Sequence, residues 1–592
     1  MPLEDYSHCR RECTLYLFFG RKTKHFFDNR ATMADHQQNG TSTVQGSIHH
    51  RRPVTTTMYR NFLTVLWIAF LPQTSSFCAR HSSGVGHPLH TLTIAKRFVV
   101  ADPEAFEDFI QEGNQTFVAK ESQVVKRRPK KLPFYTGLRY LLEVSRGRHP
   151  QYQYELQLIH GDCYIIWDTY VTLANADAIR DVLETYNLEK PPDLTESLKV
   201  MFFPTGGILA APWNEWIKQR RMTTPALAEA VIGKLAPKFQ QAAAPMFELL
   251  EDAAASQRVV EMDGVFTAMT MDTIGLITLG RTFGMLDSLL LEEQDPQAAK
   301  NRISFRNAIQ VISADAIRQT VSPRWVLKFW KPSRKVLQAK AEIDFFLEDC
   351  IDRRLKALQE ERDQPDLLNI LLDAENDGAI SRDDLKAQLI TFIFAGYDTT
   401  AHTLTFMLYE IAIDKQLQAD IAAEVTRALS ERQDFPLDPS IVNNHLPLLD
   451  CAWLETLRKH PAAASGPARV VGPEPIVVGD GLEIPAGVNI NIPPYGLHRN
   501  TEYWSDPEVF DCSRWTAKER TKRGDTLSFI PFSAGARSCL GSRLARLEAL
   551  SAMASLFRRF EVTCVETREP IPFTSLTTKP RDGIRFSFQA RG

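Results

Sequence analysis

The chain has 592 residues, of which 44% are hydrophobic and 24% are charged, a composition typical of a folded globular protein. Its 69 basic and 72 acidic residues leave a formal net charge of −3, so no nucleic-acid binding driven by counterion release is expected. The nine cysteines are odd in number and form no C-x-x-C pair, which favours neither a disulfide framework nor a thiolate zinc site and indicates a reducing compartment.

The first 130 residues carry no pattern of a folded domain. Residues 1–57 are polar, lack a sustained period and are predicted to be a disordered extension. Residues 58–130 begin with a ten-residue apolar stretch, whereas a spanning helix needs roughly 17 to 25 residues. An acid-poor stretch at 77–101 follows. The pattern fits a leader beginning at Met58 that resembles two-part plastid leaders, or a short interfacial anchor on the endoplasmic reticulum.

A basic run at 126–131 contains one proline and is followed by another. It predicts a stiff linker that either rests on anionic headgroups or is simply solvated. The folded catalytic domain is expected to cover 131–592.

The pattern of this domain is mainly helical. Segments 163–167 and 170–173 have the composition of paired strands, and Asp177 can cap the helix that follows them. From 213 to about 424 the apolar spacing is mostly helical, and strand-like pieces return between 476 and 492. The predicted fold class is therefore mainly α with a minor β-sheet region. The sequence contains no internal repeat and no glycine-rich nucleotide-binding signature.

The most informative segment reads F-S-A-G-A-R-S-C-L-G from Phe532 to Gly541 and precedes an apolar helical pattern. Cys539 stands at the expected helix start, where the macrodipole and free N–H groups favour a thiolate with a lowered pKa. Gly535 permits a turn with positive φ, Gly541 leaves room for a flat ligand, and Arg537 offers a forked donor to a carboxylate. A lone cysteine is usually only a buried helix cap, but four further positions at these spacings favour a metal ligand.

A second informative segment lies inside a predicted long helix, from Ser381 to about Asp414, which opens with a capping box. Some thirty residues at 1.5 Å each span roughly 50 Å. The middle of this helix reads A-G-Y-D-T-T and places Gly396, Asp398 and Thr399 inside an apolar run. Polar groups there need partners or a purpose. One interpretation that stays open is that the hydroxyls bond back to the preceding turn while Asp398 reaches solvent.

The loop matches, at all five named positions, the F-x-x-G-x-R-x-C-x-G signature of haem-thiolate monooxygenases, and over roughly 131–592 the chain resembles the cytochrome P-450 family. The resemblance implies the cytochrome P-450 fold, with haem b between a long central helix and the cysteine loop. It also implies that Cys539 is the axial iron ligand, that Arg537 pairs with a haem propionate and that Phe532 shields the sulfur. Thiolate ligation pushes electron density toward iron and favours O–O cleavage.

By the same resemblance, the A-G-x-[DE]-T-T stretch supplies protons on the oxygen side of the haem. Thr399 would orient water, and Asp398 would relay protons from solvent. This pair weighs against isomerases of the same fold, which often lack the threonine.

Glu455 and Arg458 lie three residues apart on one predicted helix face, which is close enough to pair, although Glu424 and Arg427 have the same spacing. The place of Glu455, 84 residues before the loop cysteine and just ahead of a His-Pro pair, resembles the family's E-x-x-R helix. The resemblance then predicts that Arg514 completes a buried structural cluster. One departure is a cysteine at 512, where the family usually has proline.

Two further segments resemble sites that bind haem propionates. Trp216 and Arg220 match the pattern W-x-x-x-R, and both side chains are donors suited to a carboxylate. Arg469 falls where another propionate-binding arginine is expected. Ordinary roles, in the core for the tryptophan and on the surface for the arginines, stay open from the sequence.

These observations predict a monooxygenase that inserts one oxygen atom from O2 into a lipophilic small molecule by hydroxylation or epoxidation. Because no flavin or iron–sulfur signature is present, electrons from NADPH must come through a separate reductase or a ferredoxin. A membrane surface is the other expected partner, and apolar positions such as Phe202 and Phe394 line the expected pocket. The alternatives are a haem-thiolate isomerase or peroxygenase of the same fold and a non-catalytic haem sensor or carrier.

Overall fold

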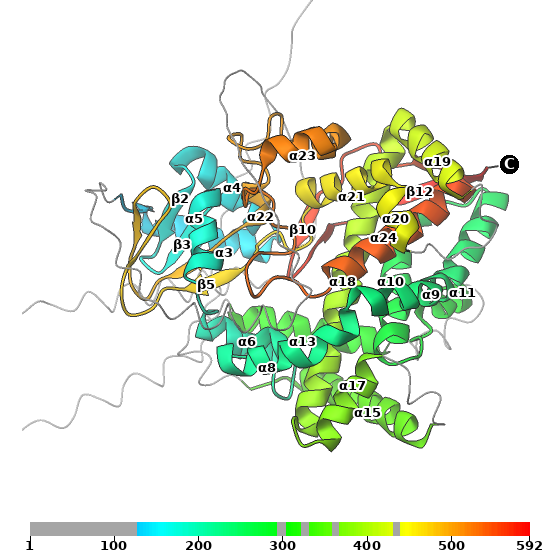
Figure 1. Ribbon diagram of the computed structural model, residues 1–592, viewed down its shortest axis with the longest axis horizontal. Coiled ribbons are helices and arrows are strands. Elements are labelled where there is room, and N and C mark those ends of the chain that lie inside the picture. The colour runs from blue at the N-terminus through cyan, green and yellow to red at the C-terminus, as the bar shows by residue number, and fades with distance from the viewer. Residues whose placement is uncertain (1–126, 293–303, 321–330, 358–365, 430–438, 592) are drawn as a thin grey trace, which may run out of the picture. The chain divides into compact units, whose positions relative to one another are not determined.

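A computed structural model describes residues 127–591, apart from 293–303, 321–330, 358–365 and 430–438 (Figure 1). The predicted disordered extension and most of the predicted leader or anchor, up to residue 126, lie outside these residues. Helices predominate in the described part and the strands are short, which confirms the fold class. Among the described residues, no helix combines the length and apolar character needed to cross a membrane.

The helices of the first half are α3 (Phe134–Ser145), α4 (His149–His160), α5 (Ala176–Arg180), the π-turn η1 (Asp181–Thr185), α6 (Pro192–Met201), α7 (Gly207–Ala210), α8 (Trp213–Thr223), the 3₁₀ turn η2 (Thr224–Leu227), α9 (Glu229–Ala255), α10 (Met262–Thr278) and α11 (Met285–Glu292). Those of the second half are α13 (Ser304–Thr320), α15 (Arg334–Lys356), α17 (Leu367–Asn376), α18 (Arg382–Ile413), α19 (Lys415–Leu429), α20 (Pro439–Asn444), α21 (Pro447–Lys459), α22 (Pro494–Leu497), η3 (Cys512–Trp515), α23 (Ala517–Arg523) and α24 (Ser542–Arg559).

The strands of the described residues form four small sheets. They are β1 (Lys130–Lys131), β2 (Cys163–Ile166), β3 (Tyr170–Leu173), β4 (Val260–Glu261), β5 (Ala468–Val470), β6 (Ile476–Val478), β7 (Leu482–Ile484), β8 (Asn489–Asn491), β9 (Phe560–Cys564), β10 (Pro572–Thr574), β11 (Thr578–Pro580) and β12 (Arg585–Ala590). The largest sheet has the order β1-β2-β3-β8-β5, in which β2 and β3 pair in antiparallel fashion as the sequence predicts.

The basic run at 126–131 is not a free linker from Arg127 onward. Strand β1 pairs in parallel with β2, and Arg127 bridges to Leu482. The Lys131 ammonium lies 2.7 Å from an Asp168 carboxylate oxygen. Backbone pairing therefore ties Arg127 to strand β7 and residues 130–131 to strand β2.

Local capping explains where two elements begin. Ser381 and Asp384 form the predicted capping box of α18, with the Ser381 Oγ accepting a hydrogen bond from Asp384 N at 3.1 Å. Helix α5 differs from the prediction, because Asn175 caps it by accepting from Ala178 N at 3.0 Å, and Asp177 lies in the first turn instead. The asparagine stands one residue before the helix, where a side-chain oxygen can reach the free N–H groups.

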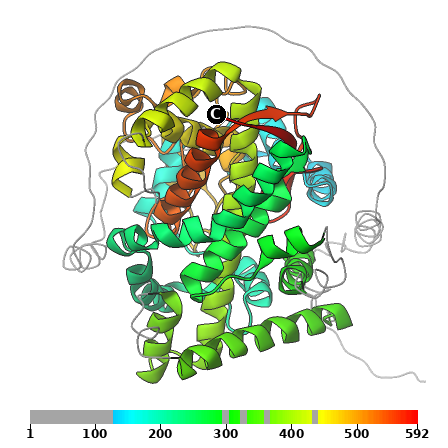
Figure 2. The ribbon, with the colours of Figure 1, turned by 90° about the vertical axis from the view of Figure 1, so that its right-hand side faces the viewer.

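Helices α9, α10, α18 and α24 supply much of the largest hydrophobic core. Figure 2 shows α18 as a long yellow-green helix behind α9 and α10, with α24 beside it. Gly396 lets α10 come close to α18, because a Cβ there would lie 2.6 Å from the Ile274 Cδ1 atom. Helix α18 therefore crosses the core with its polar central segment against α10.

Candidate active site

The loop before α24 carries Cys539. The Cys539 N–H donates to the Phe532 carbonyl oxygen at 2.9 Å, which closes the loop on itself. Gly535 has φ of +69°, and a Cβ on it would lie 2.1 Å from the Leu183 carbonyl oxygen, so no other residue fits without a backbone shift. Beside Gly541, the nearest atom to an added Cβ is the Cys539 sulfur at 4.0 Å. The first glycine permits the turn, and the second leaves open space near the sulfur.

The Cys539 side chain is exposed, although protein surrounds it at longer range. Burial raises the pKa of the Cys539 thiol, while the Gly541 N–H and the charge of Arg220 act to lower it. The lowered pKa predicted from the helix start is therefore wrong for the polypeptide by itself, because desolvation outweighs the nearby N–H group. A coordinated metal deprotonates a thiol outright, so this shift does not conflict with a ligand role.

Three cations, the buried Arg469 and the partly buried Lys190 and Arg537, gather on one side of this loop. The Arg537 guanidinium pairs with Glu189 at 3.0 Å, and its Nε has no hydrogen-bond partner among the described residues. Burial and the charge of Arg537 lower the pKa of Arg469 to about 10. Burial, Arg537 and Arg469 together lower the pKa of Lys190 to about 7. Lys190 was missed from the sequence, since a single lysine ahead of two prolines carries no signal of a site.

Helix α8 brings Trp216 and Arg220 to the same loop. The Arg220 guanidinium donates to the Ser538 carbonyl oxygen at 2.9 Å. The buried Trp216 ring lies 5.0 Å from the Arg537 guanidinium and 5.9 Å from that of Arg220. The structure thus places the W-x-x-x-R residues of α8 directly against the cysteine loop.

These side chains fit a haem. Glu189 is the one carboxylate whose charge acts on Lys190, Arg469 and Arg537 within the described residues, so the group carries surplus positive charge. Such a surplus favours an anionic partner, and a forked guanidinium with a free Nε can accept a propionate. The exposed sulfur beside a glycine supplies room for the flat ring.

The centre of α18 faces open space on one side. Ala395 is exposed and Thr399 is partly exposed, although both lie midway along a core helix. The Thr399 hydroxyl donates to the Ala395 carbonyl oxygen at 2.8 Å, and the Thr400 hydroxyl donates to that of Gly396 at 3.0 Å. The hydroxyls therefore bond back to the preceding turn, as one interpretation of the sequence proposed.

Asp398 does not project freely into solvent. Its side chain is 20% exposed, lies 3.2 Å from the His402 Nε2 atom and accepts a hydrogen bond from Thr577. Burial acts to raise the pKa of Asp398, but His402, Thr577 and the charge of Lys579 hold it below its ordinary value. Neither His402 nor Thr577 was singled out from the sequence. Packing brings Thr577 to Asp398, whereas His402 lies one helical turn after Asp398, a spacing that could have indicated the pair.

An apolar cluster joins α18 to the cysteine loop. Phe392 of α18 and Ala536 of the loop pack against the same buried group, which includes Trp216. On the same helix, Phe394 contacts Phe202 edge-on with ring centres 5.7 Å apart. Helix α18 and the cysteine loop therefore meet through a shared set of side chains, although Phe392 and Ala536 are 144 residues apart in the chain.

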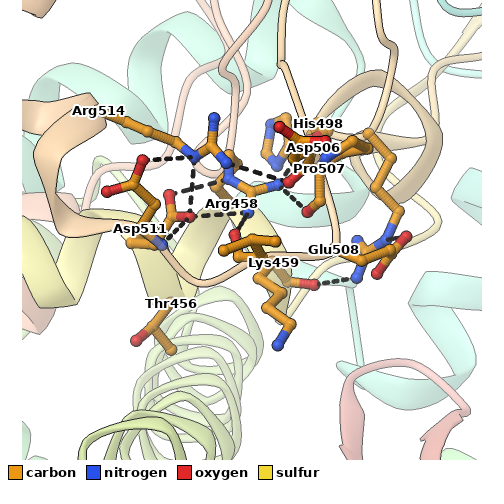
Figure 3. A network of polar contacts seen from close by, with 12 residues as sticks. Thr456, Arg458, Lys459, His498, Asp506, Pro507, Glu508, Asp511 and Arg514 are labelled. Carbon is orange, nitrogen blue, oxygen red and sulfur yellow. Dashed lines mark hydrogen bonds and ion pairs between the residues drawn. The ribbon is translucent and has the colours of Figure 1, made fainter. Parts of the chain in front are cut away.

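Arg458 is the centre of a buried polar network (Figure 3). Its Nε and Nη2 atoms donate to the two carboxylate oxygens of Glu455 at 2.9 and 2.8 Å. Arg514 donates to Glu455 at 3.2 Å, and the Trp515 indole N–H donates to it at 2.8 Å. Figure 3 shows Arg514 on one side of Arg458 and the segment with His498 on the other. The structure thus brings together the three residues grouped from the sequence and adds Trp515.

Comparisons with known proteins agree on one family. The sequence profile described as Cytochrome P450 matches residues 128–588. Cytochrome P450 4A12 of Rattus norvegicus is 28% identical over 388 residues, covering 64% of this chain and 73% of the relative. Cytochrome P450 3A7 of Homo sapiens is 29% identical over 402 residues, covering 64% and 75%. The crystal structure of the cytochrome P450DA heme domain aligns with a TM-score of 0.66 at 20% identity, covering 79% of this chain and 99% of that one.

The fold that these matches share is the one used by haem-thiolate oxidoreductases. Because the profile spans well over half of its length, the chain belongs to the cytochrome P-450 family. It is accordingly a haem-dependent monooxygenase, and the predictions of family, fold class and enzyme class are confirmed.

Proposed function

We propose that this monooxygenase binds haem b and inserts one oxygen atom from O2 into a lipophilic small molecule, by hydroxylation or epoxidation. Cys539 would be the axial iron ligand. When bound there, a thiolate-ligated haem supplies dioxygen activation. The observation that carries the proposal is the exposed Cys539 sulfur in a glycine-containing loop, with the Gly541 N–H and the Arg220 charge favouring its anion.

The surrounding side chains would hold the propionates and the ring. The donors proposed for the propionates are Trp216, Arg220, Arg469 and Arg537. Their support is the surplus positive charge of this group and the unpartnered Arg537 Nε. Phe532 would shield the sulfur, Gly535 would form the turn, and Gly541 would leave room for the ring. Lys190 lies in the same cation group and can also donate to an anion.

Asp398 and Thr399 would handle protons on the opposite side. The Thr399 hydroxyl can exchange its hydrogen bond to the Ala395 carbonyl oxygen for one to a water molecule in the open space beside it. The pKa of Asp398 is held below its ordinary value, so its carboxylate is ionised and can accept a proton from solvent. It can then pass this proton on to the Thr399 hydroxyl. Glu455, Arg458 and Arg514 would be structural, since they are tied to one another and to backbone carbonyls.

Electrons would come from NADPH through a separate reductase or a ferredoxin. The proposed location is a membrane surface, at the endoplasmic reticulum or, with a leader beginning at Met58, in a plastid. The apolar contacts of Phe394 with Phe202 and Tyr397 support a lipophilic substrate. One relative, 28% identical over 401 residues, is named taurochenodeoxycholic 6 alpha-hydroxylase of Sus scrofa, which supports a lipid-sized molecule.

Substitution of Cys539, the proposed iron ligand, tests this function. Cys539→Ser should abolish the red-shifted Soret band of the reduced, carbon monoxide-bound protein. Cys564→Ser is the matched control, because Cys564 is a partly buried thiol on strand β9. A Cys539→Ser protein that keeps the shifted band would refute the assignment. Products formed under ¹⁸O-labelled oxygen gas should carry one labelled atom, and unlabelled product would refute the monooxygenase reaction.

A further inference from the structure

His402 is buried between two carboxylates that come from different helices. It lies one turn after Asp398 on α18, and its Nε2 is 3.2 Å from an Asp398 oxygen. Its Nδ1 is 2.7 Å from an oxygen of Asp263, which lies in the first turn of α10. Both ring nitrogens therefore face an acceptor. A ring that donates at both nitrogens must carry two protons and a positive charge.

The charges around His402 favour that form. Burial by itself lowers the pKa of His402, but the hydrogen bonds and charges of Asp263 and Asp398 outweigh it and raise the pKa to about 9. Lys579, the central residue of strand β11, is a further charged group that acts on Asp398. Within the described residues, the other side-chain hydrogen bonds to the two carboxylates come from neutral hydroxyls, from Thr577 to Asp398 and from Thr405 to Asp263. At neutral pH the ring is therefore an imidazolium with a carboxylate on each side.

The position of this group relative to the proposed proton site follows from helix geometry. Residues 398 and 402 are one turn apart and share the face of α18 that meets α10, whereas Thr399 is turned by about 100° from Asp398. The His402 side chain is 5% exposed, and those of Asp263 and Asp398 are 15% and 20% exposed. The cation is thus closed off while both carboxylates keep some access to open space.

We propose that His402 is a positioning residue, clamped between Asp263 and Asp398, that fixes the Asp398 carboxylate and keeps it ionised beside Thr399. The inference deepens the proposed function, since it rests on Asp398 handling protons. If the His402 ring lost one proton, it could donate to only one of the two carboxylates. It would also lose the positive charge that balances Asp398. Proton delivery should then weaken at alkaline pH.

The first experiment measures the charge without measuring activity. Hydrogen–deuterium exchange at the imidazole C2 position, followed by mass spectrometry of the peptides, reports the pKa of each histidine in the full chain. His402 should titrate near pH 9, and Asp398→Asn or Asp263→Asn should lower that value by one unit or more. Titration of His402 below pH 7.5 in the unaltered protein would overturn the inference.

The second experiment measures the product formed per NADPH consumed, as a function of pH, with the reconstituted enzyme. His402→Gln should lower this ratio several-fold at pH 7.5, because the Asp398 carboxylate loses the donor that fixes its position, and should remove the alkaline decline. His460→Gln is the matched control, because His460 is also buried against a carboxylate of α18, with 2.6 Å to a Glu410 oxygen. It should keep the ratio and its pH profile.

The proposed proton role of Asp398 and the positioning role of His402 can be refuted separately. If Asp398→Asn keeps the ratio of the unaltered enzyme, the proposed proton role fails and the inference with it. If Asp398→Asn lowers the ratio but His402→Gln and Asp263→Asn do not, only the inference about His402 fails. The carbon monoxide difference spectrum shows which variants are folded with haem, and Asp263→Asn keeps the test decisive should His402→Gln fail to fold.

Discussion

Two buried ionic networks lie on helices that pack against each other, α21 and α18, and they are built from different cations. In the first, the Arg458 and Glu455 side chains are both fully buried, and the remaining Arg458 donors bond to backbone carbonyls. In the second, His402 joins Asp263 to Asp398, and both carboxylates keep partial exposure. The first network is closed, and the second opens at its ends.

The kind of cation in each network sets how the network responds to pH. A guanidinium stays protonated throughout the physiological range, so the Glu455 network keeps its charges and its geometry. An imidazole changes charge at accessible pH, so the His402 network can respond to protons. Fixed charge suits a scaffold, whereas titratable charge suits a site where protons move.

The largest expected effect comes from opening the closed network. Arg458→Ala leaves Glu455 buried and without its main cation, which should cost about 3–5 kcal/mol of unfolding free energy. Arg427→Ala is the control, because Glu424 has the same spacing to its arginine but accepts from the N–H groups of Leu448 and Leu449. It should cost about 1 kcal/mol or less. Urea unfolding measures the loss of unfolding free energy in both variants. Equal losses would show that the Glu455 network does not depend on its arginine more than Glu424 does.

Glu548 is a buried carboxyl that has no cation among its hydrogen-bond partners in the described residues, in contrast to the carboxylates of the two networks. Burial raises the pKa of Glu548 to about 8, and its Oε1 has no partner among the described residues. It borders a pocket of about 290 Å³ between α9, α10 and α24. The Thr273 hydroxyl, which also donates to the Met269 carbonyl oxygen, hydrogen-bonds Glu548 and acts to lower this pKa, but burial outweighs it. Glu548 is therefore protonated in the fold at neutral pH.

Because its folded pKa is above its unfolded value of 4.5, the contribution of Glu548 to stability is fully present below pH 4.5 and is lost as pH rises through 8. Glu548→Gln should remove this loss and be the more stable protein at pH 9, by about 2–4 kcal/mol. Thermal or urea unfolding at pH 5 and pH 9 measures it. An equal stability difference at both values would contradict the shifted pKa.

His402 should show the same sign for the opposite chemical reason, since here the charged form is favoured. Its folded pKa of about 9 exceeds the unfolded value of 6.5, so its contribution is fully present below pH 6.5 and disappears as pH rises through 9. That contribution is about 3 kcal/mol. The stability difference between the unaltered protein and His402→Gln should shrink from pH 6.5 to 9.5, and a constant difference would show that His402 does not hold an extra proton.

The smallest effect on stability is expected at Thr399. Thr399→Ala and Thr400→Ala each remove one back-bond to the preceding turn, and alanine favours the helix, so each should change stability by about 1 kcal/mol or less. Only Thr399→Ala should lower the product formed per NADPH and raise peroxide. The ratio of product to NADPH and a peroxide assay measure this, and equal ratios for the two variants would remove Thr399 from the mechanism.

Spacing in the sequence was enough for the parts of the site that are local. The Gly535 turn, the capping box of α18 and the pairing of Glu455 with Arg458 each involve residues within a few positions of one another, where backbone geometry dictates the distance. Arg514 lies 56 residues beyond Arg458 and was placed by resemblance, not by spacing. The same limit explains why Trp515, one residue further on, was missed as a partner of Glu455.

The errors share a physical cause as well. The start of the helix suggested a lowered pKa for Cys539, but the sequence does not show how much protein surrounds the sulfur, and burial outweighs the helix. Lys190 carried no local signal, because packing brings it close to Arg537 and Arg469. His402 had a spacing signal to Asp398, but only packing places Asp263 on its other side.

The amino-acid sequence was enough for the family and the helical class, and it supplied the cysteine proposed to hold iron, because short motifs encode local backbone geometry and residue chemistry. Tertiary structure alone decided which charges face one another: the cations beside the loop, and the imidazole held between carboxylates from two helices. Electrostatic effects depend on distance and burial in space, and neither can be read from separation along the chain.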